Sequence, residues 1–226
     1  MQRVSKKFGG THALIDAGID VAAGEIVALL GENGAGKSTL IKVLAGVHAL
    51  DAGEVYYRGR DVTAHLRGLP IAFIHQDLGL VEWMTVAENI SLMLGYPRRF
   101  GVIDWNAARS RAARALATLG ADIDPDQRVQ ELTRTDKSMV AIARALAADA
   151  ELLVLDEPTA SLPTADVARL FTALRRLRSK GVGMIYVSHR LDEVFEIADD
   201  ISVFRDGQFI HAAPASELTS DKIIQL

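Results

Sequence analysis

The chain has 226 residues, of which 49% are hydrophobic, and this is enough for one large domain or two small ones with a sizeable core. The net charge of −4 excludes a global basic field for nucleic acid, and the absence of cysteine excludes disulfides and thiolate metal sites. Because every apolar run is far too short to span a bilayer and the N-terminus "MQRVSKKFGG" has no signal-peptide core, a soluble cytoplasmic protein is expected.

The first part of the chain predicts strands around one helix. In chain order, "IDVAAGEI" (Ile19–Ile26) is typical of an antiparallel strand, and "GEIVALLG" (Gly24–Gly31) of a buried strand that ends in glycine. A helix is then expected over "GKSTLIKVLAGV". Its inner side should carry Leu40, Ile41, Leu44 and Val47. Next, "AGEVYYRGRDV" (Ala52–Val62) again favours antiparallel strands beside this core.

Three later apolar runs predict further buried strands, each ending in polar residues: "PIAFIHQ", "ELLVLDEP" and "VGMIYVSH". Strands that end in polar residues, with helices between them, indicate a parallel α/β sheet whose site lies at the carboxyl ends of its strands. Near the C-terminus, "ISVFRDGQFIHAA" predicts a hairpin with Asp206-Gly207 at its turn.

The pattern between Thr85 and Ala148 is helical, and "WNAARSRAARALATLG" is amphipathic with arginines on one side. Arg109, Arg111 and Arg114 suggest either a nucleic-acid face or a solvated helix face. We favour the solvated face because no aromatic residues interleave with these arginines. We therefore expect a helical subdomain, about residues 85–148, inserted into an α/β core formed by residues 1–84 and 149–226.

The stretch "GENGAGKS" fits the phosphate-loop pattern G-x-x-x-x-G-K-[ST] in full, between a predicted strand and a predicted helix. Its glycines let backbone N–H groups wrap a phosphate, Lys37 reaches the β- and γ-phosphates, and the Ser38 hydroxyl ligates Mg²⁺. A glycine-rich turn that binds nothing would not need Lys and Ser in this order. The expected nucleotide-binding residues here are Gly31, Asn33, Gly34, Ala35, Gly36, Lys37, Ser38 and Thr39.

A second motif, "LLVLDEP", combines a buried strand with two carboxylates at its end. Asp156 is expected to hold Mg²⁺ beside the phosphate loop, directly or through water. Glu157 is then placed to polarise the attacking water. An Asp-Glu pair at a strand end is weak on its own, but together with a phosphate loop it indicates nucleotide hydrolysis.

Together these motifs resemble the ATP-binding domain of an ABC transporter, over nearly the whole chain. The stretches "GENGAGKSTLIKVLAGV", "FIHQDLGLVEWMTVAENISL", "LLVLDEPTASL" and "IYVSHRLDEVFEIAD" are most similar to the sugar-importer class, the ribose and galactoside type. The resemblance implies an α/β fold: a P-loop NTPase core with a mostly parallel sheet, an N-terminal antiparallel β subdomain and an inserted helical subdomain.

The same resemblance implies an ATP-hydrolysing subunit that uses ATP and Mg²⁺ to drive uptake of a sugar or similar small solute. Its implied partners are a second ABC ATP-binding domain in the same or a separate chain, transmembrane permease subunits and, indirectly, a solute-binding protein, with no nucleic acid. Its implied location is peripheral, on the cytoplasmic face of the cell membrane. The class usually has two such domains in one chain, so the sequence leaves open whether this is half of a fused protein or a fragment.

Further roles follow from the resemblance, residue by residue. Gln76 lies where the family has a glutamine that touches Mg²⁺ or the lytic water and links the site to the helical subdomain; the alternative is a solvated loop residue. His189 lies where the family has a histidine that contacts the γ-phosphate. Phe8 lies where an aromatic ring stacks on adenine, unless it is a core residue. His75 and the remaining histidines show no metal-like spacing and are treated as structural or surface residues.

The chain departs from the family at two places. The family's signature, Leu-Ser-Gly-Gly-Gln, aligns with Leu132 to Asp136, which read "LTRTD", so both glycines are replaced. The loop after Glu157 reads "SLPTAD", with Pro163 at a variable place. In the family, this signature completes the ATP site of a partner domain. Asp136 is expected to cap the following helix while its charge opposes ATP, whereas Arg134 could compensate as a cation.

The altered signature leads us to expect an impaired site in the partner domain and a complete site around this domain's own Lys37. Two rival functions stay open. One is a regulatory or structural ABC module with little turnover, which the altered signature favours and the intact Glu157 and His189 oppose. The other is a non-transport ABC protein acting on ribosomes or DNA, which would tend to carry charged linkers or coiled-coil insertions that this sequence lacks.

Overall fold

The computed structural model describes residues 1–160 and 162–225, and the chain divides into two compact units. The first unit comprises Met1–Ile71 and Gly183–Leu226, and the second comprises Ala72–Val182. The helical segment expected between residues 85 and 148 lies within the second unit. This division by packing does not test the expected domain limits, which stay a prediction.

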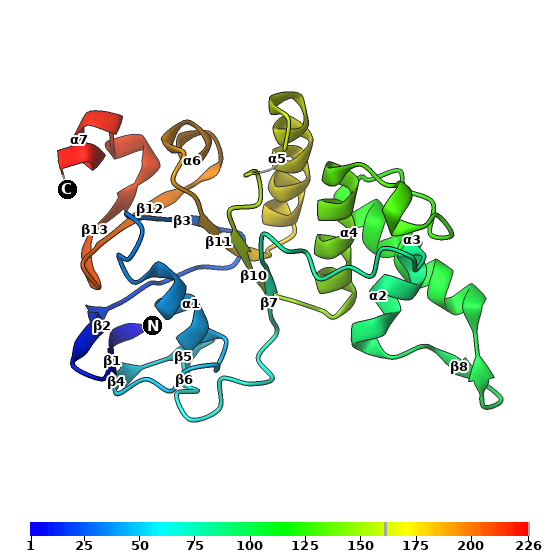
Figure 1. Ribbon diagram of the computed structural model, residues 1–226, viewed down its shortest axis with the longest axis horizontal. Helices are drawn as coiled ribbons and strands as arrows, with labels where there is room; N and C mark the ends of the chain where they lie inside the picture. Colours follow the sequence, from blue (N-terminus) through cyan, green and yellow to red (C-terminus); the bar gives the residue numbers. More distant parts are fainter. Residues whose placement is uncertain (161, 226) are drawn as a thin grey trace. The chain divides into compact units, whose positions relative to one another are not determined.

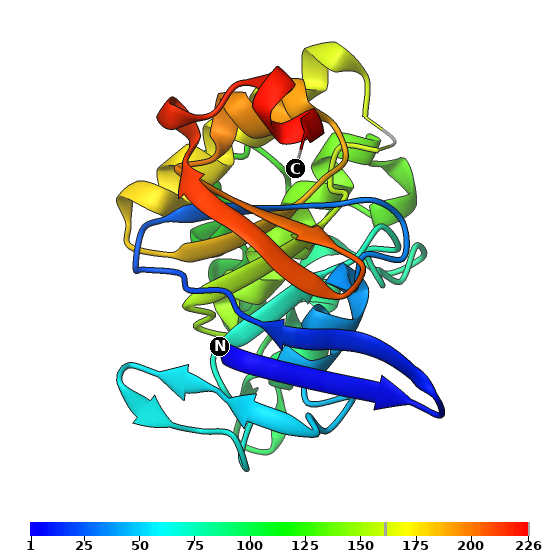
Figure 2. The ribbon, with the colours of Figure 1, turned by 90° about the vertical axis from the view of Figure 1, so that its left-hand side faces the viewer.

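The first unit is built on a mixed sheet (Figure 2). Its strands are β1 (Gln2–Phe8), β2 (Thr11–Ala17), β3 (Ile26–Leu30), β4 (Ala52–Glu54), β11 (Gly183–Val187), β12 (Asp200–Arg205) and β13 (Gln208–Pro214). They follow the order β4-β1-β2-β13-β12-β3-β11. The central β3 pairs in parallel with both β11 and β12, whereas β1 pairs antiparallel with β2 and β4. The expected parallel core and N-terminal antiparallel subdomain are therefore confirmed.

The hairpin expected near the C-terminus is also confirmed. Strands β12 and β13 pair antiparallel, and Asp206 (φ 51) and Gly207 (φ 77) form the turn between Arg205 and Gln208. Positive φ at both central residues matches the twist of the flanking strands, which explains the Asp-Gly pair. In Figure 2 this hairpin, in orange to red, and the β1–β2 pair, in blue, both face the viewer. Strands β5 (Tyr56–Tyr57) and β6 (Arg60–Asp61) form a further small hairpin.

Two expectations for the first unit are wrong. The segment Ile19–Ile26 is no antiparallel strand, because Ala22 to Gly24 form a turn in which the Glu25 N–H donates to the Ala22 carbonyl oxygen at 3.3 Å. Val47, expected on the inner side of a helix, is 62% exposed. Helix α1 (Lys37–Leu44) ends before it, and Gly46 (φ 66) turns the chain away.

The rest of helix α1 follows the prediction. Its apolar side chains Leu40, Ile41 and Leu44 are buried, so the amphipathic pattern placed this face correctly. Two short helices complete the unit, α6 (Leu191–Ile197) and α7 (Ser220–Gln225), together with the 3-10 turn Ala215–Glu217.

The second unit combines two neighbouring strands with a group of helices (Figure 1). The strands are β7 (Ile71–Ile74), whose first residue alone belongs to the other unit, and β10 (Leu152–Asp156). The helices are α2 (Val86–Leu94), α3 (Trp105–Leu119), α4 (Arg134–Ala147) and α5 (Thr164–Ser179). Helices α2, α3 and α4 pack pairwise against one another, and α5 packs against α3 and α4. The expected group of helices is thus present.

One element inside this helical region was not expected. Strands β8 (Arg98–Arg99) and β9 (Val102–Ile103) form a hairpin between α2 and α3. Phe100 (φ 53) and Gly101 (φ 84) make its turn, and the Phe100 side chain is 94% exposed. The helical pattern of the flanking segments gave no indication of this short hairpin. The 3-10 turn Val129–Glu131 precedes α4, and Pro163 precedes α5; Ser161 lies outside the described residues.

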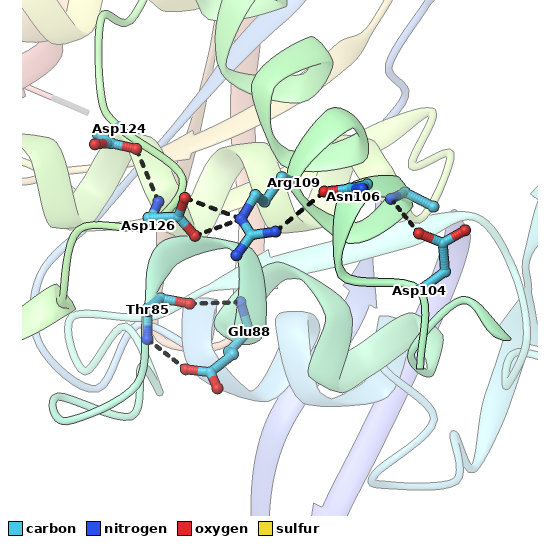
Figure 3. Close-up of polar contacts among 8 residues, drawn as sticks. Thr85, Glu88, Asp104, Asn106, Arg109, Asp124 and Asp126 are labelled. Atoms are coloured by element: carbon cyan, nitrogen blue, oxygen red, sulfur yellow. Dashed lines mark hydrogen bonds and ion pairs between the residues drawn. The ribbon is translucent and has the colours of Figure 1, made fainter. Parts of the chain in front are cut away.

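Side-chain caps fix where α2 and α3 begin (Figure 3). Thr85 and Glu88 form a reciprocal capping box, with hydrogen bonds of 3.2 Å and 2.7 Å. Asp104 caps α3 by accepting from the Ala107 N–H at 3.0 Å. Arg109 pairs with Asp126 at 2.6 Å, which agrees with a solvated helix face. Among the described residues, no helix is long and apolar enough to cross a membrane.

Candidate functional site

The phosphate-loop motif lies between β3 and α1, as the sequence predicts, and its shape depends on glycine at two positions. Gly31 (φ 151) and Gly36 (φ 98) both have backbone conformations that other residues rarely adopt. A side chain at Gly31 would collide with the Phe204 carbonyl oxygen. A Cβ at Gly36 would lie 2.7 Å from the Ala13 carbonyl oxygen. Both glycines are therefore required by close approach of neighbouring backbone.

Lys37 closes this loop from inside. Its Nζ donates to the Gly31 carbonyl oxygen at 2.5 Å and to the Glu32 carbonyl oxygen at 2.9 Å. The first turn of α1 contains no acidic residue, so the positive end of the helix dipole is not neutralised there. Gly34 has open space around it, which leaves the loop backbone accessible. The ammonium and the helix N-terminus together fit a polyphosphate ligand.

The remaining loop residues differ in exposure. Asn33 and Ser38 are exposed, Thr39 is half-buried and Ala35 is only 4% exposed. Ser38 therefore presents its hydroxyl at the first turn of α1, where the sequence places an Mg²⁺ ligand. Ala35 contributes through its backbone, because its carbonyl oxygen accepts from the Gly207 N–H at 3.1 Å.

Phe8 and His189 also belong to the first unit. Phe8, at the end of β1, is 44% exposed and is therefore no core residue. Its ring meets the His48 ring edge-on at a centroid distance of 5.0 Å, and Lys6 Nζ lies 5.5 Å from it. An exposed ring of this kind offers a face for stacking. His189 is exposed and follows the buried Ser188 at the carboxyl end of β11.

In the second unit, the carboxylates follow β10. Leu153 and its two successors are buried, whereas the Asp156 side chain is 34% exposed. Glu157 has φ 50, a conformation that is uncommon for a residue with a side chain and that occurs more often at functional sites. The strand therefore anchors both carboxylates, and the backbone turns sharply at Glu157.

Sequence reasoning missed one neighbour of Asp156. His75, treated above as a structural or surface residue, lies with its Nδ1 3.8 Å from Asp156 Oδ2. Strands β7 and β10 are adjacent, so the residue after β7 comes close to the residue that ends β10. The signal was present in the sequence: both runs end in polar residues, which places their ends together only if the strands are neighbours.

Gln76 is exposed, and the backbone of its loop is held by arginines of α4. Arg134 donates to the Gln76 carbonyl oxygen at 3.0 Å. Arg144 donates to the Leu78 and Gly79 carbonyl oxygens, both at 2.7 Å. Desolvation by burial lowers the pKa of Arg144 from its ordinary value. The sequence did not single out Arg144, because an arginine inside a helical pattern carries no mark of its target.

The altered signature forms the start of α4, with one correction. Thr133, not Asp136, caps the helix: the Thr133 hydroxyl accepts from the Asp136 N–H at 3.1 Å and donates to Asp136 Oδ2 at 2.7 Å. Asp136 Oδ1 also lies 3.1 Å from Arg169 NH2. Thr135 is completely buried, and its hydroxyl has no hydrogen-bond partner in the described part of the chain. The polar groups of this segment are thus mostly engaged within their own unit.

The predicted site residues divide between the units. The first unit holds Phe8, the phosphate loop and His189, and the second holds Gln76, Asp156 and Glu157. Across residues 1–160 and 162–225, no group of three or more histidine, cysteine, aspartate or glutamate side chains is arranged to hold a metal ion. Of the expected Mg²⁺ ligands Ser38, Gln76 and Asp156, only Asp156 belongs to these residue types. The absence of such a group therefore does not test the expected ligand set, which stays a prediction.

Known proteins are similar to this chain over nearly its whole length. The family model described as ABC transporter matches residues 14–160. The chain is 46% identical over 229 residues to a putative ribose/galactose/methyl galactoside import ATP-binding protein of Ralstonia nicotianae, covering 99% of this chain and 44% of that protein. It is 44% identical over 230 residues to the ribose import ATP-binding protein RbsA of Caldanaerobacter subterraneus, covering 100% and 46% respectively. The chain thus spans less than half the length of these relatives.

Solved structures show the same fold. The chain superposes on a nucleotide-free ATP-binding cassette from an ABC transporter with a TM-score of 0.82 and 27% identity, covering 99% of this chain and 92% of that one. It superposes on a Clostridium perfringens protein that is part of an ABC transporter complex with a TM-score of 0.85 and 26% identity, covering 99% and 90%. The α/β fold predicted from the sequence is thereby confirmed.

Proposed function

Because this chain belongs to the ABC transporter family, we propose that it is an ATP-binding and ATP-hydrolysing subunit of an importer that takes up a sugar or a similar small solute through a membrane permease. The observation that carries the proposal is the phosphate loop. Backbone crowding admits only glycine at Gly31 and Gly36, and Lys37 lies inside the loop. The import function and the sugar class are supported by the names of the relatives, which extend over about twice the length of this chain.

Each predicted site residue has a role in this proposal. Lys37 and the loop N–H groups bind the β- and γ-phosphates, and Phe8 stacks on the adenine. Ser38, Gln76 and Asp156 would hold Mg²⁺, which would neutralise charge on the phosphates. These donors are hydroxyl, amide and carboxylate oxygens, the hard ligands that Mg²⁺ prefers.

Hydrolysis is assigned to two further side chains. Glu157 accepts a proton from the attacking water through its carboxylate, and His189 donates to the γ-phosphate. The positive φ of Glu157 supports this role, because a backbone conformation of this cost persists only where the surrounding structure requires it. The buried strand β10 fixes the backbone that precedes Glu157, which limits the movement of the Glu157 carboxylate.

The proposal includes a second ABC domain, in the same or another chain, and transmembrane permease subunits, with this chain bound at the cytoplasmic face of the membrane. Two such domains would sandwich ATP head to tail, so the segment Thr133–Asp136 would face the nucleotide of the partner domain. Two observations support impairment of that partner site. The Thr133 hydroxyl is engaged with Asp136, and Thr135 is buried where the family has glycine. The site around Lys37 would instead receive the partner's signature.

A regulatory module with little turnover is the second candidate. It is favoured by the same segment, since a domain with no exposed glycine there contributes little to a phosphate site. An ATPase assay with permease and partner domain present separates the two candidates. We expect turnover in the complex and its loss in Glu157→Gln. A complex that transports solute with no hydrolysis assignable to Lys37 and Glu157 would favour the regulatory module.

A further inference from the structure

The loop that carries Gln76 is held from both ends of one helix. Arg134, the first residue of α4, donates to the Gln76 carbonyl oxygen at 3.0 Å. Arg144, in the last turn of α4, donates to the Leu78 and Gly79 carbonyl oxygens at 2.7 Å each. Guanidinium hydrogen bonds are stronger than those between neutral groups. The backbone of this loop is therefore positioned by α4 and not only by β7.

The two arginines differ in their surroundings. Arg144 is half-buried, whereas Arg134 is exposed. The neighbours of Arg134 in the altered signature are turned toward their own unit, since Thr135 is buried and Thr133 is bonded to Asp136. Arg134 is thus the side chain through which the exposed start of α4 contacts the Gln76 loop.

We infer that Arg134 is a positioning residue, which fixes the backbone of the Gln76 loop and links it to the segment Thr133–Asp136. The inference rests on the proposed function, in which Gln76 contacts Mg²⁺ in this chain's own site. In the same proposal, the segment faces the nucleotide of the partner domain. Because the Arg134 guanidinium donates to the Gln76 carbonyl oxygen, a displacement of the segment would reach the backbone that carries the Gln76 side chain.

The first test follows the loop itself and needs no nucleotide. Arg134→Ala should raise the hydrogen-exchange rate of the backbone amides of residues 76–79 by on the order of tenfold, because loss of a charge-assisted hydrogen bond favours local opening. Arg109→Ala is the matched control, since it removes another exposed arginine of the same unit, one that pairs with Asp126. It should leave these amides unchanged. Unchanged exchange in Arg134→Ala would overturn the inference.

The second test asks whether Arg134 acts through Gln76. Calorimetry in Mg²⁺ and in EDTA gives the gain in ATP affinity that the metal confers. That gain should fall about tenfold in Arg134→Ala, at the low end of the effect of residues that orient metal ligands, while affinity in EDTA stays the same. Gln76→Ala should show a comparable fall, and the double variant no further fall. Additive losses in the double variant would refute the positioning role.

A failure of the proposed function would look different. An unaltered chain that binds no ATP, or binds it equally well after Lys37→Ala, would remove the nucleotide site. The exchange comparison between Arg134→Ala and Arg109→Ala would still decide whether Arg134 holds the loop. The two ideas can therefore fail separately.

Discussion

Lys37 is the residue on which the proposed nucleotide binding should most depend. Its ammonium reaches two carbonyl oxygens of its own loop, Gly31 and Glu32, at 2.5 Å and 2.9 Å. A cation held inside a loop of backbone N–H groups is a partner for phosphate, and it strengthens each neighbouring N–H contact by attracting the same anion. The glycines give the loop its shape, while Lys37 gives it charge.

We expect Lys37→Ala to weaken MgATP binding by about 2–5 kcal/mol, the cost of truncating one partner of a desolvated charged contact. Isothermal titration calorimetry measures the difference directly. Lys42→Ala is the control, because Lys42 is an exposed lysine in the last turn of the same helix. Equal ATP affinity in the Lys37 and Lys42 variants would remove the phosphate-loop assignment.

A substitution of Glu157 tests ATP hydrolysis rather than ATP binding. Glu157→Gln keeps the shape of the side chain and removes its ability to accept a proton. ATP binding should therefore be retained, while the hydrolysis rate falls by about 10²–10⁴-fold, the contribution of a positioned general base. Single-turnover hydrolysis in the assembled complex is the measurement. A variant that turns over at the unaltered rate would show that another group activates the water.

At the scale of elements, the start of α4 is a capped helix end. Thr133 supplies the cap, Asp136 accepts from its hydroxyl, and Arg169 of α5 pairs with Asp136. These contacts hold the helix end against its own unit. Replacement of the glycines does not prevent a helix here, because glycine is a poor helix former and Thr133 supplies the cap.

Thr133→Ala should lower the free energy of unfolding by about 1 kcal/mol, the usual effect of losing a threonine cap. Urea denaturation with an unchanged slope would measure it. Thr172→Ala provides the comparison, because the exposed Thr172 hydroxyl donates within α5 to the Ala168 carbonyl oxygen at 2.8 Å and caps no helix end. If both variants are equally stable, the hydroxyl of Thr133 does not stabilise α4.

The elements also show what the sequence could predict. The Asp206-Gly207 hairpin and the buried strand β3 were predictable, since a turn type or an apolar run fixes each locally. The strand expected over Ile19–Ile26 failed because its alternation of polar and apolar residues ends in an Ala-Ala-Gly turn. The contacts between Arg134 and Gln76, or between His75 and Asp156, join residues far apart in sequence. Local patterns place polar residues at the ends of strands, but they do not show which strands are neighbours or which side chain an arginine will reach.

At the scale of the whole molecule, this chain spans less than half the length of the relatives it matches. In a head-to-tail pair, each nucleotide would lie between the phosphate loop of one domain and the signature of the other. Under the proposed function, the altered signature would therefore act mainly on the nucleotide bound by the partner domain. The consequence of Thr133–Asp136 depends on which domain pairs with this one.

An isolated copy should be monomeric or a weak dimer in the presence of MgATP. A homodimer would place Arg134 and Asp136 at both nucleotide sites, and Asp136 would add negative charge near each triphosphate. Sedimentation velocity with MgATP tests this, and Glu157→Gln serves as the stringent case because it should trap any closed dimer. A tight dimer that hydrolyses ATP quickly would show that the altered signature is competent.

The last prediction compares the two sites within one transporter. With a partner domain that has a complete signature, Lys37→Ala should abolish uptake, whereas the matching lysine change in the partner should have a milder effect. The reason is that ATP on Lys37 meets the complete signature, while ATP on the partner meets Thr133–Asp136. Restoring serine at position 133, glycine at 134 and 135, and glutamine at 136 should raise turnover at the partner's site. Solute uptake by the two lysine variants is the measurement. Equal losses would mean that the sites are coupled or that Arg134 replaces the missing contacts, and a larger loss in the partner would reverse the assignment of the impaired site.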